Sequence, residues 1–180
     1  LFLYKIYFKE VLDDGGFDIV IGNPPYVRHE KITELKAKLQ TENYQSYTGT
    51  ADLYIYFFEQ GFNLLKHNGY LSFITSNKYA RANYGKNFRK FTLDNTQIKE
   101  YIDFNGVKVF DSATVDTSIL LFKKNKNSNY KFIFCDINED YRRNEVLGKY
   151  IDENCFKYSS QDLSIDSFSF SRSSDLKLRK

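Results

Sequence analysis

The stretch from Phe17 to Tyr26 constrains the fold more than any other part of the chain. Phe17–Ile21 is a short apolar run with β-branched residues, which predicts a buried strand. Asn23-Pro24-Pro25-Tyr26 cannot continue that strand, because each proline removes a backbone N–H and fixes φ. The stretch therefore predicts a rigid turn that presents one amide and one aromatic ring at the carboxyl end of a strand, where open α/β sheets bind ligands.

This turn suits chemistry on an amino group attached to a planar base. Such a nitrogen is a poor nucleophile, because its lone pair is delocalised into the ring. Two acceptors, the Asn23 side-chain oxygen and the Pro24 carbonyl, would pull it towards a tetrahedral shape and free the lone pair. The Tyr26 ring offers a flat face for an extruded base, held in line with a methyl donor. The alternative is a plain strand-ending turn with a buried Asn.

The segments after the turn alternate between helix and strand patterns. Helices are predicted over Leu53–Lys66, with Asp52 as N-cap, and over Arg81–Leu93. Strands are predicted over Tyr70–Thr75, Gln97–Phe104, Thr117–Phe122 and Tyr130–Asp136. This alternation predicts parallel neighbours, but the residues between Phe104 and Thr117 leave no room for a crossover helix. The predicted fold class is therefore α/β, with a mostly parallel sheet and one antiparallel strand.

Side-chain patterns predict how the two helices face the sheet. The buried stripe of the first helix comprises Leu53, Tyr56, Phe57, Leu64 and Leu65. Lys66–Gly69 predicts its end, with Gly69 in the left-handed conformation and His67 as a cap residue rather than a catalyst. In the second helix Phe88 and Phe91 are expected inside, and Lys86, Arg89 and Lys90 outside.

The segment Val27–Thr50 is long, polar and rich in lysine. Ile32, Leu35 and Leu39 have helical spacing, which predicts a short amphipathic helix. Its basic residues are Arg28, Lys31, Lys36 and Lys38. They predict either a flap that touches a phosphate backbone or an ordinary solvated helix face.

Asn23-Pro24-Pro25-Tyr26, after a Phe-Asp-Ile-Val-Ile-Gly strand, resembles the catalytic motif of the gamma-class DNA adenine methyltransferases. The longer form into Val27-Arg28 is most similar to the methyltransferase part of type IIG restriction–modification enzymes. The resemblance covers roughly residues 10–165. It implies a partial S-adenosylmethionine-dependent methyltransferase fold of Rossmann-like type. It also implies methyl transfer from S-adenosylmethionine to the amino group of a flipped-out adenine, with Asn23, Pro24, Pro25 and Tyr26 as catalytic residues.

The resemblance also gives a role to Phe110, in Val-Phe-Asp-Ser-Ala-Thr-Val. The family carries an aromatic residue at the matching place, and its ring stacks on the flipped base opposite the motif tyrosine. Phe110 is thereby implied as the second base-stacking residue. The alternative is an aromatic plug beneath a loop.

The resemblance matches only the second half of a methyltransferase domain. The chain contains no G-x-G-x-x-G fingerprint, so the cofactor loop is expected before Leu1, which leaves Asn23 at the edge of the cofactor pocket. Residues 1–125 are expected to be the second half of the catalytic domain, and residues 126–180 a linker to a target-recognition domain. The expected partners are double-stranded DNA and these two absent parts. A fragment alone is expected to be inactive, with an exposed sheet edge and apolar face.

Composition adds weak limits. The chain has 26 basic and 23 acidic residues, a balance that is compatible with a nucleic-acid partner. Its two cysteines and two histidines show no zinc-site spacing, so no metal site is expected. Separated thiols favour a reducing compartment, the cytoplasm. No apolar run is long enough to span a membrane, and no membrane partner is expected.

Two other functions stay open. Methyltransferases of RNA bases or of protein glutamine also use Asn-Pro-Pro-Tyr, because their acceptor is again a planar nitrogen. The polar segment after Tyr26 and the connector after Lys123 look more like the restriction–modification enzymes. A non-catalytic DNA-binding remnant is the third interpretation, because the cofactor half is not in this sequence.

Overall fold

In the computed structural model, the described residues are 2–110, 115–138, 141 and 146–170. They form one six-stranded sheet in the order β1-β2-β4-β3-β5-β6. The strands are β1 (Phe17–Gly22), β2 (Leu65–Ser76), β3 (Gln97–Asp103), β4 (Thr117–Lys123), β5 (Lys131–Asp136) and β6 (Cys155–Ser159). The mixed α/β sheet predicted from the sequence is confirmed.

The sheet contains both parallel and antiparallel neighbours. β1 and β2 are parallel, as are β3 and β5, whereas β4 runs antiparallel to both β2 and β3. The predicted reversal of Thr117–Phe122 is therefore correct. β6 is a second reversed strand, antiparallel to β5, which the prediction of one antiparallel strand did not include.

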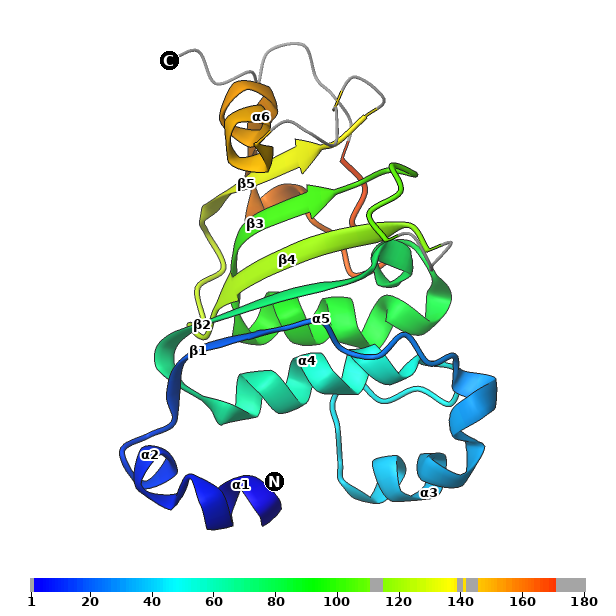
Figure 1. The fold of residues 1–180 in the computed structure, drawn as a ribbon, viewed down its shortest axis with the longest axis vertical. Coiled ribbons are helices and arrows are strands. Elements are labelled where there is room, and N and C mark those ends of the chain that lie inside the picture. The colour runs from blue at the N-terminus through cyan, green and yellow to red at the C-terminus, as the bar shows by residue number, and fades with distance from the viewer. Residues whose placement is uncertain (1, 111–114, 139–140, 142–145, 171–180) are drawn as a thin grey trace.

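Helices cover opposite faces of this sheet (Figure 1). On one face α4 (Leu53–Leu64) and α5 (Lys86–Asn95) bury Tyr54, Phe58 and Phe88 against the sheet. On the other face α6 (Leu147–Asn154) packs near β5 and buries Tyr150. Strand alternation explains the division, since Leu120 and Phe122 of β4 face α4 and α5, while Ile119 faces the other way.

The shorter elements complete the outline. α1 (Phe2–Tyr7), α2 (Lys9–Asp13) and α3 (Thr33–Thr41) lie at the β1 end of the molecule, and α6 lies at the β5 end (Figure 1). The 3₁₀ turns are η1 (His29–Ile32), η2 (Asn77–Ala80), η3 (Asn83–Gly85) and η4 (Ser160–Asp162). Along the part of the chain that the structure describes, no helix is long and apolar enough to cross a membrane.

The strand before the turn is not buried as predicted. β1 lies at the edge of the sheet, and Ile19 and Ile21 are 65% and 79% exposed. Only the face that carries Val20 packs, against the core beneath α4. The apolar run correctly indicated a strand with two apolar faces, but the described residues cover only one of them.

The helix predicted over Leu53–Lys66 ends earlier than expected. α4 stops at Leu64, and β2 begins at once with Leu65. Asn68, not Gly69, adopts a positive φ of 67°. His67 lies within the exposed start of β2, so it does not cap a helix. Phe57, predicted inside, is 40% exposed, while Ile55 and Phe58 are fully buried.

Arg89 is the clearest error among the predicted helix faces. It was expected outside but is only 1% exposed. Its guanidinium donates to the carbonyls of Tyr79 and Ala82, and to those of Ile165 and Asp166 far along the chain. Gly85 allows this approach, because a Cβ there would lie 2.1 Å from the Tyr79 oxygen. Arg89 thus ties the end of the described chain to the turns after β2.

The C-terminal part of the described chain belongs to the same sheet. β5 pairs with β3, and Phe168 is buried in the core beneath α5. Cys135 and Cys155, expected to be separated thiols, are cross-strand partners in β5 and β6, and both are buried. The proposed division at residues 125–126 therefore does not interrupt the sheet, and it stays a prediction about domain roles.

Candidate active site

The Asn23–Tyr26 turn lies where β1 ends at Gly22. Pro24 is buried, whereas Asn23 and Pro25 are exposed. The Val27 N–H donates to the Pro25 carbonyl at 3.0 Å, and the Leu53 N–H donates to the Val27 carbonyl at 3.0 Å. These bonds hold the turn against the start of α4. Asp52, at the predicted N-cap position, instead accepts from the His29 N–H at 3.0 Å and so fixes the segment that follows the turn.

Asn23 and Pro24 present free acceptors. Across the described part of the chain, neither the Asn23 side chain nor the Pro24 carbonyl takes part in a hydrogen bond. An exposed amide whose position is set by a proline turn is available to a ligand without first losing an internal partner. Free acceptors are a condition for the two hydrogen bonds that the sequence predicted, and that role of Asn23 and Pro24 stays a prediction.

Tyr26 is half-buried, and its hydroxyl binds the neighbouring strand. The hydroxyl donates to the Ile74 carbonyl of β2 at 3.1 Å. Burial raises the pKa of Tyr26 to about 12, so the hydroxyl stays protonated and remains a donor at neutral pH. The bond fixes the plane of the ring relative to the carboxyl end of β2.

The structure brings Phe110 to Tyr26. Their ring centroids are 6.1 Å apart, and the ring planes meet at 66°, an edge-to-face contact. The two residues are far apart in sequence, and Phe110 comes from the loop that leaves β3. The next residues, 111–114, including Asp111 and Ala113 of the quoted motif, lie outside the described residues.

Two residues that the sequence analysis did not single out hold this loop. The Asn77 side-chain amide donates to Asp103 Oδ1 at 2.9 Å, and the Asn105 N–H donates to the same oxygen at 3.1 Å. Asp103 is 5% exposed. The sequence offered one indication of these two residues, which is that each stands at the carboxyl end of a predicted strand, much as Asn23 stands just after β1.

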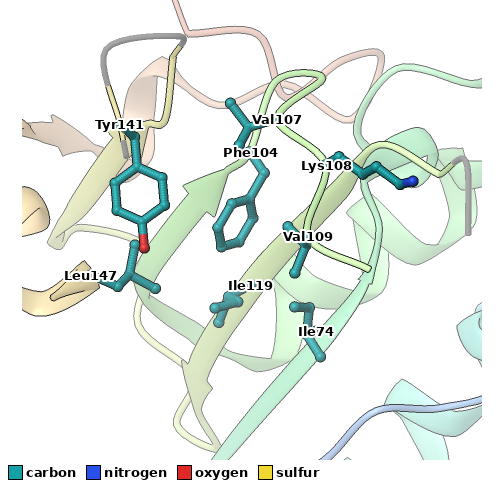
Figure 2. Close-up of a pocket in the computed structure, with 8 residues that line it drawn as sticks. All are labelled: Ile74, Phe104, Val107, Lys108, Val109, Ile119, Tyr141 and Leu147. Carbon is teal, nitrogen blue, oxygen red and sulfur yellow. The ribbon is translucent and has the colours of Figure 1, made fainter. Parts of the chain in front are cut away.

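A pocket of about 420 Å³ lies beneath the same loop (Figure 2). Its lining is mostly apolar and comprises Ile74, Phe104, Val107, Lys108, Val109, Ile119, Tyr141 and Leu147. Figure 2 shows Val107 and Val109 over the sheet and the Lys108 side chain directed away from the pocket. Ile74 belongs both to this pocket and to the Tyr26 hydrogen bond, so pocket and ring pair share one strand. No group of His, Cys, Asp and Glu residues within the described ranges is arranged to hold a metal ion.

Comparison with known proteins gives one consistent result. Residues 1–110 match the family described as Eco57I restriction-modification methylase. Type II restriction enzyme and methyltransferase RM.Eco57I of Escherichia coli is 32% identical over 124 residues, which are 67% of this chain and 12% of that protein. Type II methyltransferase M.BstVI of Geobacillus stearothermophilus is 34% identical over 124 residues, which are 69% of this chain and 22% of that protein. The chain thus spans less than a quarter of either relative.

Solved structures resemble the sheet in the same way. The methyltransferase subunit of a type I restriction-modification system from Streptococcus thermophilus matches with a TM-score of 0.61 at 18% identity, over 82% of this chain and 35% of that one. The type IIG restriction endonuclease BpuSI matches with a TM-score of 0.53 at 22% identity, over 69% of this chain and 15% of that one. These likenesses confirm the methyltransferase fold that the family resemblance implied.

Proposed function

The chain belongs to the Eco57I restriction-modification methylase family, and we propose that it supplies the base-binding half of a DNA adenine methyltransferase site. The observation that carries the proposal is the contact of the Tyr26 and Phe110 rings beside the Asn23–Pro24 turn, in which Asn23 is exposed. Two aromatic rings next to two free acceptors suit a flat base with an exocyclic amino group.

Asn23 and Pro24 would act on the amino group. The Asn23 Oδ1 and the Pro24 carbonyl accept hydrogen bonds from its two N–H groups. The nitrogen lone pair is released from the ring as the nitrogen becomes tetrahedral. Neither oxygen has a hydrogen-bond partner among the described residues, so no such bond is lost when the base arrives. The reaction needs a bound methyl donor, S-adenosylmethionine, which supplies an activated methyl group.

Tyr26 and Phe110 would hold the base on its two faces. Their present edge-to-face contact occupies the place between them, so the base must replace that contact. An aromatic pair of this kind is worth about 0.5–1.5 kcal/mol, whereas each stacked base gains about 1–3 kcal/mol per ring. The exchange favours the base.

The remainder of the site would come from outside this chain. Within the described residues β1 has a partner only on its β2 side, and Ile19 and Ile21 are exposed on its uncovered face. An upstream half-domain that carries the cofactor loop would pair with this edge and cover this face. Residues 1–125 then form the second half of the catalytic domain, and residues 126–180 lead towards target recognition. Asn23 would reach only the edge of the cofactor pocket.

Double-stranded DNA is the proposed substrate, and the cytoplasm the proposed compartment. The segment directly after Tyr26 carries Arg28 and Lys31, both exposed, followed by Lys36 and Lys38 on α3. Cations next to an extruded base are placed to contact the phosphates that flank it.

Removal of either ring is expected to weaken base binding. Tyr26→Ala and Phe110→Ala should each cost about 1–3 kcal/mol of stacking. The readout is the fluorescence of DNA with 2-aminopurine at the target base, bound to the full-length protein. Phe57→Ala removes a half-exposed ring from the outer side of α4 and serves as control. Unchanged fluorescence with both ring variants would refute the role of the pair.

A further inference from the structure

The carboxyl end of β2 holds both aromatic rings of the proposed site. Three residues before Asn77, the Ile74 carbonyl accepts from the Tyr26 hydroxyl at 3.1 Å. Asn77 itself follows the last residue of β2 and contacts both ends of the loop that carries Phe110. The backbone from Ile74 to Asn77 therefore determines how far apart the two rings lie.

Asn77 reaches the two loop ends with different groups. Its side-chain Nδ2 donates to Asp103 Oδ1 at 2.9 Å, where the loop leaves β3. Its backbone N–H donates to the Asp116 carbonyl at 2.9 Å, just before the chain enters β4. Asn77 thus helps to close the base of the Phe104–Asp116 connection, together with the bond from the Phe104 N–H to the Thr117 carbonyl at 3.0 Å.

Asp103 transmits the side-chain contact to the loop. The oxygen that accepts from Asn77 also accepts from the Asn105 N–H at 3.1 Å. Asn105 and Gly106 both have positive φ, 41° and 85°, so the loop turns sharply there before it runs to Phe110. A charge-assisted bond to the first amide of this turn fixes its direction.

We propose that Asn77, acting through Asp103, is a positioning residue that keeps the Phe110 ring opposite Tyr26. The inference rests on the proposed function, because it gives Phe110 a role in base binding. The proposed effect of Asn77 on the Phe110 ring is indirect, because Asn77 acts on the loop that carries the ring. Loss of the Asn77 side chain should therefore slow methyl transfer by misplacing the Phe110 ring rather than by unfolding the sheet.

The test uses Asn77→Asp, Asp103→Asn and the double variant N77D/D103N in the full-length protein. Asn77→Asp sets two carboxylates against each other, and Asp103→Asn removes the charge that orders the Asn105 N–H. The double variant again pairs one amide donor with one carboxylate, and the remaining amide oxygen can accept from Asn105. Each single change should lower kcat about tenfold to hundredfold and alter 2-aminopurine fluorescence, and the exchange should restore both to within about threefold.

Asn125→Asp is the matched control. Asn125 donates an amide hydrogen bond of 2.8 Å to Asn68 Oδ1, at the opposite end of β2 and β4. Because this bond lies far from both rings, Asn125→Asp should leave kcat and fluorescence unchanged. If the single variants match this control, or if the exchange restores nothing, the positioning role is wrong. If the unmodified protein gives neither methyl transfer nor a fluorescence change, the proposed function fails, and the inference fails with it.

Discussion

Asn23→Ala is expected to abolish most methyl transfer while the fold stays intact. The amide would meet the amino group only as it becomes tetrahedral, so its loss removes stabilisation of the transition state. By analogy with the loss of one oxyanion-hole donor, the cost is about 3 kcal/mol, or roughly a hundredfold in kcat. Stability should change by less than about 0.5 kcal/mol, because the exposed side chain has no hydrogen-bond partner among the described residues.

Single-turnover methyl transfer by the full-length protein measures this effect. Asn63→Ala is the matched control, since Asn63 is an exposed amide on α4. Near-normal turnover in Asn23→Ala would contradict the mechanism proposed for the turn. A loss of turnover in both variants would show that the effect is not specific to the turn.

Among the substitutions proposed for this protein, Arg89→Met is expected to lower the free energy of unfolding most. The methionine keeps most of the apolar stem but leaves the carbonyls of Tyr79, Ile165 and Asp166 without their donor, while the Ala82 carbonyl keeps its bond from the Gly85 N–H. Because the site is buried, the cost is about 3 kcal/mol. The segment from Ile165 to Phe168 should detach first, since the guanidinium binds two of its carbonyls.

Hydrogen exchange of the full-length protein locates this loss. The Phe168 N–H donates to the Ala80 carbonyl at 2.8 Å and reports on attachment of the segment. Its exchange should become roughly a hundredfold faster in Arg89→Met. Lys90→Met, one residue along on the exposed side of α5, should leave it unchanged. Equal exchange in the two variants would show that Arg89 does not hold the segment.

Local patterns predicted every strand except β6, although β2 begins five residues before the predicted start at Tyr70. β3 and β4 were placed within one residue at each end, and their reversal followed from the short connection between them. The turn after β1 was predicted from its prolines. Phe110 was placed by family resemblance, and the structure brings its ring to Tyr26, although its role in base stacking stays a prediction.

Features that depend on distant partners were missed. Arg89 has the sequence signature of a surface residue, and its burial depends on carbonyls 76 and 77 residues away. Asn77 and Asp103 meet across 26 residues. The exposure of Ile19 and Ile21 could not be predicted from their own pattern, because an apolar strand has the same sequence whether or not a second layer covers it.

The most direct test of the base-binding proposal is methyl transfer from labelled S-adenosylmethionine. The full-length protein and this chain alone would each be offered double-stranded DNA, RNA and protein, and the labelled product would be identified. The proposal predicts label on the amino group of adenine in DNA, from the full-length protein only. Label on RNA or protein, or no label from the full-length protein, would contradict it.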